Sequence, residues 1–145
     1  MIDGVLVTPL KQIEDGRGKV MHMLRSDQNM YRGFGEIYFS SVRFGSIKGW
    51  NLHTLMTVNY AVPHGLIKLV LYDNRNKSKT HGLVQDVLIG NRNYCLVTVP
   101  PMIWISFKGI SKGQALLANC ASLAHDPDEK HWRDLSDPMF PLIWG

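Results

Sequence analysis

Long apolar runs and cysteine motifs are both missing from this sequence. No apolar stretch approaches the ~20 residues that a membrane-spanning helix needs, and the first residues, Met1 to Gly4, lack the basic-then-apolar pattern of a secretion signal. The two cysteines, Cys95 and Cys120, form no CxxC pair, which excludes the usual thiolate metal or redox motif, and their apolar surroundings favour buried free thiols. We therefore expect a cytoplasmic protein that does not associate with membranes.

A long helical pattern is also missing. The 145 residues suit one domain, and 45% of them are hydrophobic, which is enough for a core. Short apolar runs alternate with turn residues, most clearly where Met56, Val58, Tyr60 and Val62 share one face. The runs that we predict to be strands are Val5–Leu10, Gly18–Leu24, Gly35–Phe44, Ile47–His53, Met56–Val62, Leu66–Tyr72, Leu83–Ile89, Tyr94–Val99, Met102–Phe107 and Gln114–Cys120. This pattern predicts an all-β sandwich or barrel.

The last segment has a different composition. Residues 121–145 are acidic, contain three prolines and end in an apolar run. We expect a single domain over 1–145, with a barrel over 1–120 and an irregular tail whose apolar end packs on the barrel or on a second subunit. Within the tail, Asp126 and Pro127 are typical of the start of a short helix.

Positive charge dominates before the tail. The formal net charge is +4, but residues 1–125 hold fourteen basic side chains against seven acidic ones. This excess favours an anionic partner. The basic residues are dispersed and do not form the runs typical of nucleic-acid-binding arms, so we predict no nucleic-acid partner but a pocket for a small anion such as a diphosphate. The side chains that can surround it are Arg17, Arg25, Arg43, Lys48, Lys68 and Arg75.

Five parts of the chain, taken in order, match the pattern of one family. They are Asp15–His22 (like D-x-R-G-x-F-x-E), Ile47–Asn51 (like L-R-G-L-H), Tyr72–Arg75 with Lys79–Gly82 (like V-D-I-R…S-P-T-F-G), Pro100–Phe107 (like P-x-G-x-x-H-G-F), and Ser136–Pro138 with Trp144 (like W-D-D-P…W). The chain thus resembles the dTDP-4-dehydrorhamnose 3,5-epimerases, and even more closely some shorter cupins with K-x-W-H-x-H and L-Y-D-x-R. The resemblance implies a cupin double-stranded β-helix (jelly roll), usually a homodimer, that holds a nucleotide-linked 4-keto-6-deoxyhexose and needs no metal or other cofactor.

The resemblance also implies a division of labour. In that family, a histidine with an aspartate behind it removes the proton next to the ketone, a tyrosine on the opposite face returns one, and a basic residue steadies the enolate. A proton next to a carbonyl needs such a base of near-neutral pKa, together with positive charge at the oxygen. The catalytic roles are thereby assigned to His53, Lys48 and Asp137. Lys48 falls where the family has an arginine, and Asp137 matches the aspartate that orients the base.

The family's catalytic histidine is replaced in this chain. Asn51 falls on it, and an asparagine side chain cannot accept a proton at neutral pH, although it can bind a sugar hydroxyl or ketone. His53 lies two residues further on, so on a strand it points to the same side. His53 either takes over as the base, contacts the ligand, or only lines the pocket. A two-residue shift in the alignment would instead place His53 on the family histidine itself.

Further residues are predicted to bind the substrate beside Asn51. Arg17 matches the nucleotide-contacting arginine of the family, Arg75 belongs to the set of dispersed basic residues, and Tyr60 can stack on a base or a sugar. Lys68 interrupts an apolar strand and points either outward to solvent or inward as a pocket cation. We expect the inward orientation.

Two other features of the family are missing. Ile105 falls on the histidine of the second cupin motif and Asn51 on that of the first, which leaves His53 isolated and a poor site for zinc or iron. We therefore predict no catalytic metal. The reprotonating tyrosine is absent from residues 119–127, where only His125 can donate a proton.

Two functions remain open from the sequence. The first is proton-transfer epimerisation or isomerisation of a nucleotide-linked keto sugar, in surface polysaccharide or deoxysugar biosynthesis. The second is a catalytically degenerate cupin that binds a sugar nucleotide or saccharide without turnover, which the replacements at Asn51 and Ile105 favour. A metal-dependent dioxygenase-type cupin is a weaker third alternative, because the ligand histidines are missing.

Overall fold

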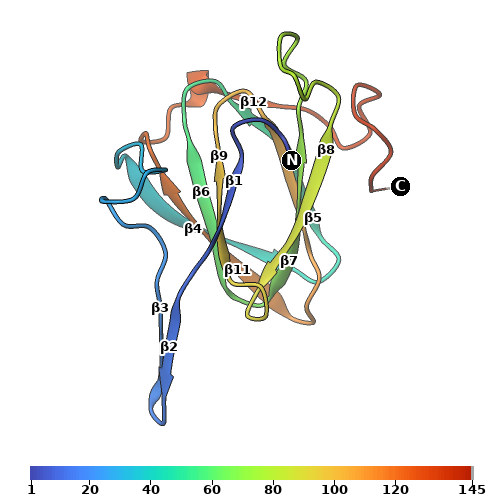
Figure 1. Ribbon diagram of the computed structural model, residues 1–145. Helices are drawn as coiled ribbons and strands as arrows, with labels where there is room; N and C mark the ends of the chain where they lie inside the picture. The colour runs from blue at the N-terminus through green and yellow to red at the C-terminus, as the bar shows by residue number, and fades with distance from the viewer. Residues whose placement is uncertain (145) are drawn as a thin grey trace.

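The computed structural model describes residues 1–144 and is built almost entirely from β-strands (Figure 1). Two five-stranded antiparallel sheets pack face to face: sheet I has the strand order β1-β9-β6-β11-β4, and sheet II has the order β12-β5-β10-β7-β8. The strands are β1 (Leu6–Pro9), β2 (Gln12–Asp15), β3 (Gly18–Met21), β4 (Glu36–Arg43), β5 (Ile47–His53), β6 (Val58–His64), β7 (Leu66–Tyr72), β8 (Val84–Gly90), β9 (Cys95–Val99), β10 (Trp104–Gly109), β11 (Gln114–Ala121) and β12 (Lys130–Trp132). The all-β prediction is confirmed.

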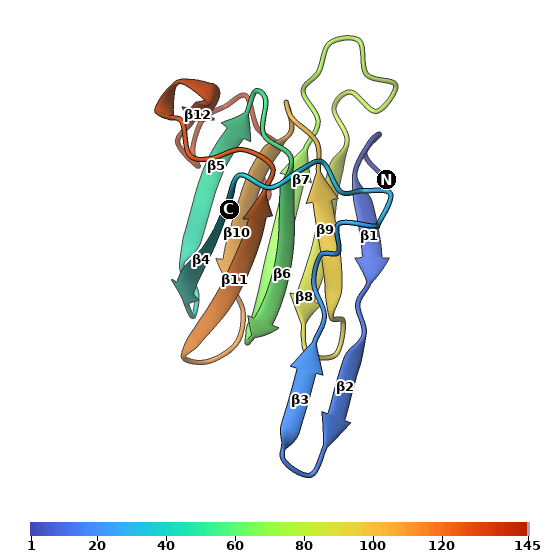
Figure 2. The ribbon, with the colours of Figure 1, turned by 90° about the vertical axis from the view of Figure 1, so that its left-hand side faces the viewer.

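Two strands lie where the sequence predicted none. Strand β2 pairs with β3 in a hairpin that projects away from both sheets (Figures 1 and 2). Strand β12 forms inside the predicted irregular tail and pairs with β5 at the edge of sheet II. The predicted helix is shortened to one 3-10 turn, Pro127–Glu129, capped by the Asp126 side chain, which accepts a hydrogen bond from the Asp128 amide. Both unpredicted strands are short and polar, so they carry little hydrophobic alternation.

The main core lies between the two sheets. The alternation predicted for β6 holds, since Val58, Tyr60 and Val62 are buried in this core. On β7 the core-facing residues include Ile67 and Leu69. Successive residues of a strand face opposite sides. The core-facing residues therefore tell which way each remaining side chain on these strands points.

A second apolar cluster covers the outer face of sheet II. It joins Trp50 and Trp104 of the sheet to Phe140 of the tail. The rings of Trp50 and Phe140 are stacked, with 4.4 Å between their centroids and 11° between their planes. Trp144 adds a hydrogen bond from its indole nitrogen to Ser106 Oγ at 3.0 Å. The C-terminal segment is therefore fixed to the back of β5 and β10.

A β-bulge in β5 decides which of its side chains face inward. Asn51 is opposite Ile105 on β10, but the next residue of β10, Ser106, is opposite Gly49, so that Trp50 has no partner. Gly49 has a φ of +136°, and a Cβ there would lie 2.5 Å from Ser106 Cβ, so a side chain does not fit. The bulge places Lys48 on the same inner side as Asn51, which a regular strand would not do.

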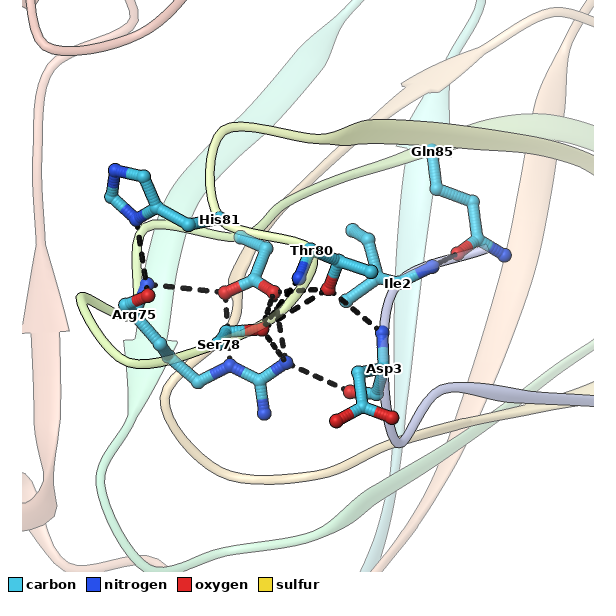
Figure 3. Close-up of polar contacts among 8 residues, drawn as sticks. Ile2, Asp3, Arg75, Ser78, Thr80, His81 and Gln85 are labelled. Atoms are coloured by element: carbon cyan, nitrogen blue, oxygen red, sulfur yellow. Dashed lines mark hydrogen bonds and ion pairs between the residues drawn. The ribbon is translucent and has the colours of Figure 1, made fainter.

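A polar cluster anchors the loop that follows β7 (Figure 3). The buried Asp73 carboxylate accepts hydrogen bonds from Arg75, Ser78 and Thr80, and Arg75 also donates to the Asp3 carbonyl at 2.8 Å. Burial acts to raise the pKa of Asp73, but these hydrogen bonds outweigh it and hold the pKa far below its usual range. The cluster ties the N-terminal residues to the loop.

Within residues 1–144, no helix has the length and apolar character needed to cross a membrane.

The stack of Trp50 on Phe140 yields a stability prediction. Trp50 is 1% exposed, and its indole nitrogen has no hydrogen-bond partner among residues 1–144. Trp50→Phe keeps an aromatic ring on Phe140 and removes the unpaired donor, so we expect a loss of stability of about 1 kcal/mol or less. Trp50→Ala leaves a cavity and should cost about 3–5 kcal/mol. Urea unfolding measures both; equal losses for the two variants would contradict the stacking role.

Candidate functional site

A cavity of about 170 Å³, here called the inner cavity, opens between the two sheets. Sheet I provides one wall and sheet II the other. The lining residues are Tyr38, Ser40, Tyr60 and Leu117 from sheet I, and Lys48, Asn51, His53, Phe107 and Lys130 from sheet II. The structure thus brings four of the predicted site residues together: Lys48, Asn51, His53 and Tyr60.

His53 is the most strongly constrained side chain of the inner cavity. It is 6% exposed, and its Nδ1 lies 2.5 Å from Oε1 of the buried Glu129. The other carboxylate oxygen of Glu129 accepts hydrogen bonds from the backbone amides of Leu55 at 3.2 Å and Met56 at 3.1 Å. Glu129 therefore joins the 3-10 turn to the end of β5 and to the connection that leads into β6.

The charge of Glu129 sets the tautomer of the neutral His53 ring. Burial acts to raise the pKa of Glu129, but hydrogen bonds from His53, Leu55 and Met56 together lower it below its usual range. An ionised carboxylate can only accept hydrogen bonds, so the neutral imidazole must carry its hydrogen on Nδ1. Nε2 has no hydrogen-bond partner among residues 1–144, and its lone pair is left for a group in the inner cavity.

Two lysines reach the inner cavity from neighbouring strands. Lys48 Nζ donates to Ser40 Oγ at 2.9 Å and to the Ser41 carbonyl at 2.6 Å, so it is held against β4. Lys130 is in register with His53 on β12 and has no ion pair within the described part of the chain. The inner cavity therefore has one fixed and one free ammonium group.

Two tyrosines face these groups from sheet I. The hydroxyl oxygen of Tyr38 accepts a hydrogen bond from Nδ2 of the buried Asn119 at 2.9 Å, which leaves the hydroxyl hydrogen available. Burial, with a smaller contribution from Tyr38, raises the pKa of Tyr60 far above its usual range, so Tyr60 keeps its proton. The wall opposite His53 thus carries two phenols that can donate hydrogen.

Two predicted site residues lie outside the inner cavity, each paired with another charged side chain. Asp137 is paired with Arg133 at 3.3 Å and accepts a hydrogen bond from the Met139 amide, so Glu129 and not Asp137 contacts His53. Arg75 belongs to the Asp73 cluster, because a buried carboxylate needs a cation and donors around it.

Lys68 and Arg17 are also placed elsewhere. The expected inward orientation of Lys68 is corrected: its neighbours on β7 fill the core, so parity turns Lys68 to the outer face, where Nζ lies 3.7 Å from Asp86 and 5.7 Å from the centre of the Trp144 ring. Arg17 lies in the turn between β2 and β3, paired with Asp15 at 2.7 Å and almost fully exposed.

Sequence reasoning missed three residues of the site. Glu129 and Lys130 belong to the tail, and Tyr38 lies on β4, where the sequence showed no site motif. The one available signal was the helix start at Asp126 and Pro127, because a turn begun there sets the direction of the residues that follow it. Among residues 1–144, no group of three or more His, Cys, Asp or Glu side chains is arranged to hold a metal ion.

No family model matches the chain. It is 30% identical to a probable low-salt glycan biosynthesis epimerase of Haloferax volcanii, covering 89% of this chain and 86% of the relative. It is 29% identical to the spore coat polysaccharide biosynthesis protein SpsL of Bacillus subtilis, covering 89% and 85%. A solved dTDP sugar isomerase from Desulfovibrio desulfuricans is 40% identical, with a TM-score of 0.95 over 99% of this chain and 92% of that one. The RmlC epimerase of Mycobacterium tuberculosis is 18% identical to this chain and has the same fold, with a TM-score of 0.85 over 99% of this chain and 77% of that one. The predicted cupin jelly roll is therefore confirmed.

The contact between Glu129 and His53 yields a prediction on acid stability. Because folding lowers the pKa of Glu129, its carboxylate stabilises the fold above the ordinary carboxyl pKa of about 4.3, and this contribution is lost as the pH falls through the lower folded-state value. Glu129→Gln should cost about 1–3 kcal/mol at neutral pH and should flatten the loss of stability in acid. Urea unfolding between neutral and acidic pH measures both.

The control for this prediction is Glu14→Gln, which changes an exposed carboxylate on the hairpin. It should follow the unsubstituted protein at every pH. Nitrogen NMR of the His53 ring adds a second readout, since Glu129→Gln should allow both neutral tautomers where the unsubstituted protein shows hydrogen on Nδ1. An unchanged acid profile and an unchanged tautomer in Glu129→Gln would remove Glu129 from this role.

Proposed function

The chain belongs to the dTDP-4-dehydrorhamnose 3,5-epimerase-like family of cupins, and from that premise we propose that it transfers protons on a nucleotide-linked 4-keto-6-deoxyhexose, as an epimerase or isomerase of polysaccharide biosynthesis. One observation carries the proposal. His53 has its Nδ1 held by a buried carboxylate and its Nε2 free toward the inner cavity, while phenols line the opposite wall. The ligand class is supported by the dTDP sugar isomerase that shares 40% of its sequence with this chain.

In this proposal His53 is the general base. Its Nε2 takes a proton from the carbon next to the sugar ketone, and the resulting imidazolium is stabilised by the charge of Glu129. The same carboxylate fixes the ring orientation, so the base does not have to find its position during the reaction. Asn51, two residues earlier on the same wall, is placed to donate its amide hydrogen to the ketone or to a hydroxyl.

The negative charge that leaves carbon moves to the ketone oxygen and needs a cation. Lys48 and Lys130 are the ammonium groups of the inner cavity, and a preorganised charge at a developing oxyanion is an effective form of stabilisation. Lys48 is already held by Ser40 and the Ser41 carbonyl, so its position changes little when substrate binds. Lys130 is free to follow the substrate or to meet its diphosphate.

Return of a proton from the other face completes an epimerisation. Tyr38 is the best placed donor, because Asn119 donates to its oxygen and would stabilise the phenolate that forms. Tyr60 lies deeper in the same wall. This assignment gives the acid role to β4, in place of the segment 119–127 in which the family pattern suggested a tyrosine.

The alternative is a cupin that binds a sugar nucleotide or saccharide without turnover. It is favoured by Asn51, which the motif resemblance aligns with the family's catalytic histidine. In that case the inner cavity binds its ligand through the same lysines and amide, and His53 only contacts it.

Hydrogen–deuterium exchange separates the two functions. The protein is incubated with dTDP-4-keto-6-deoxyglucose in deuterated water, and deuterium at C3 and C5 is read by NMR. We expect incorporation that falls by about 10²-fold or more in His53→Gln, because the general base is lost. His64→Gln, which changes an exposed histidine of β6, should keep the full rate.

Two outcomes would contradict the proposal, the first its enzymatic activity and the second the role of His53. Binding of dTDP without any exchange would establish the non-catalytic alternative. Exchange that survives in His53→Gln at the rate of His64→Gln would show that another group is the base, in which case Tyr38→Phe distinguishes the tyrosine from the remaining candidates.

The proposal includes a homodimer. The β2–β3 hairpin forms no pairing with either sheet and exposes Ile13 and Val20, although an isolated two-stranded hairpin is rarely stable. Strand β4 is an edge of sheet I and exposes Ile37 and Phe39. The hairpin of one copy laid along β4 of another would cover both surfaces and extend the sheet. It would also bring Arg17 close to the wall that carries the inner cavity of the second copy.

The dimer is tested by measuring the molecular mass in solution by light scattering. Val20→Glu places a charge on the exposed side of the hairpin and should convert a dimer into a monomer. Leu88→Glu, at an exposed position of β8 on the far edge of sheet II, should leave the mass unchanged. A monomeric unsubstituted protein would overturn the dimer without affecting the assignment of His53.

The cytoplasmic location remains part of the proposal. Cys95 and Cys120 are both free thiols, which suits a reducing compartment.

A further inference from the structure

A second cavity, of about 320 Å³, lies on the other side of β5 from the inner cavity; we call it the outer cavity. On β5 and β12, Leu52 and His131 are paired neighbours that face it, whereas His53 and Lys130 are paired neighbours that face the inner cavity. Its lining residues are Leu52, Asn74, Arg75, Met102, Trp104, His131, Arg133 and Met139. None of them lines the inner cavity.

The outer cavity combines an apolar floor with a rim of hydrogen-bond donors. Leu52, Trp104 and Met139 form the apolar part. The polar part of the lining includes Arg75 and Arg133, which come from segments almost sixty residues apart in the chain. This combination fits a ligand that carries a compact negative charge, because apolar surroundings strengthen a charge-assisted hydrogen bond.

Neither guanidinium is fully used by the protein. Arg75 donates hydrogen bonds from Nε and Nη2 to the Asp73 carboxylate, which fixes the guanidinium group in place. Its Nη1 has no partner within residues 1–144. Arg133 uses only Nη1, in a 3.3 Å contact with Asp137 that is partly exposed to solvent, so its Nε and Nη2 remain available. Exposed pairs of this kind are weak and are readily exchanged for a better acceptor.

We propose that the outer cavity is a binding site for a phosphate group, held between Arg75 and Arg133 with His131 and Asn74 at the rim. A tetrahedral oxyanion can accept from both guanidinium groups at once, each presenting a planar set of N–H donors. Asp73 and Asp137 offset part of the positive charge, which predicts modest affinity. The site is independent of the proposed reaction, since it shares no lining residue with the inner cavity.

The outer cavity is also connected to the backbone around His53. The Met102 amide donates to the His53 carbonyl at 2.7 Å, and Met102 has a positive φ of 70°, which is unusual for a residue other than glycine. The Arg133 amide and carbonyl both bond to Trp50, each at 3.0 Å. A phosphate in the outer cavity would therefore contact residues that hold β5 in place.

The site is tested by titrating the full chain with inorganic phosphate at constant ionic strength and following the ¹H–¹⁵N resonances. We expect saturable shifts of the Trp104 indole and of residues 131–133. Arg133→Gln should weaken binding by about tenfold or more, because one charged donor set is lost. Arg92→Gln, at an exposed arginine in the turn before β9, should bind as the unsubstituted protein does.

A second variant and a second ligand complete the test. His131→Gln also removes a rim group and should weaken binding while leaving Arg133 in place. Glucose 1-phosphate binding more tightly than inorganic phosphate would identify an organic phosphate as the ligand, and equal binding would identify the free anion. The proposal is overturned by shifts that do not saturate, by equal affinity in Arg133→Gln and Arg92→Gln, or by shifts confined to His53 and Lys130.

Discussion

The contact between Glu129 and His53 holds the candidate site together. A carboxylate buried to this degree is tolerated only when its oxygens are satisfied, and Glu129 meets that condition with one imidazole and two backbone amides. The same contacts bring the tail onto the edge of sheet II, where β12 adds Lys130 to the wall of the inner cavity. A chemical requirement of one side chain thereby determines where a whole segment lies.

Strand β5 serves two faces of sheet II with different chemistry. Lys48, Asn51 and His53 line the inner cavity, while Trp50 and Leu52 pack under the tail. Only the bulge at Gly49 allows this distribution, because regular alternation would put Lys48 with the tryptophan. The polar groups of the inner cavity are thus backed by a tightly packed aromatic layer, which restrains the strand that carries His53.

Much of the fold could be predicted from the sequence, because β6 alternates clearly between its two faces and β7 is a continuous apolar run between turn residues. The short strands could not, since three or four polar residues at an edge have no hydrophobic period. Lys48, Asn51 and His53 were found because their segment resembles a family motif, and Tyr60 because it lies on a strand with clear alternation. Glu129 was missed because its role depends on a contact across 76 positions of the chain. Lys68 was misplaced because both faces of β7 are apolar, so the sequence does not reveal which face meets the core.

The late position of Glu129 has a consequence for biosynthesis. The ribosome translates β1 to β11 before the turn that carries Glu129. These strands include the central strands of both sheets. A ribosome-bound chain at that stage can collapse into two sheets, but its imidazole lacks the carboxylate that sets its tautomer. The imidazole would thus acquire its fixed tautomer only when the segment that carries Glu129 has been translated and has packed against the end of β5.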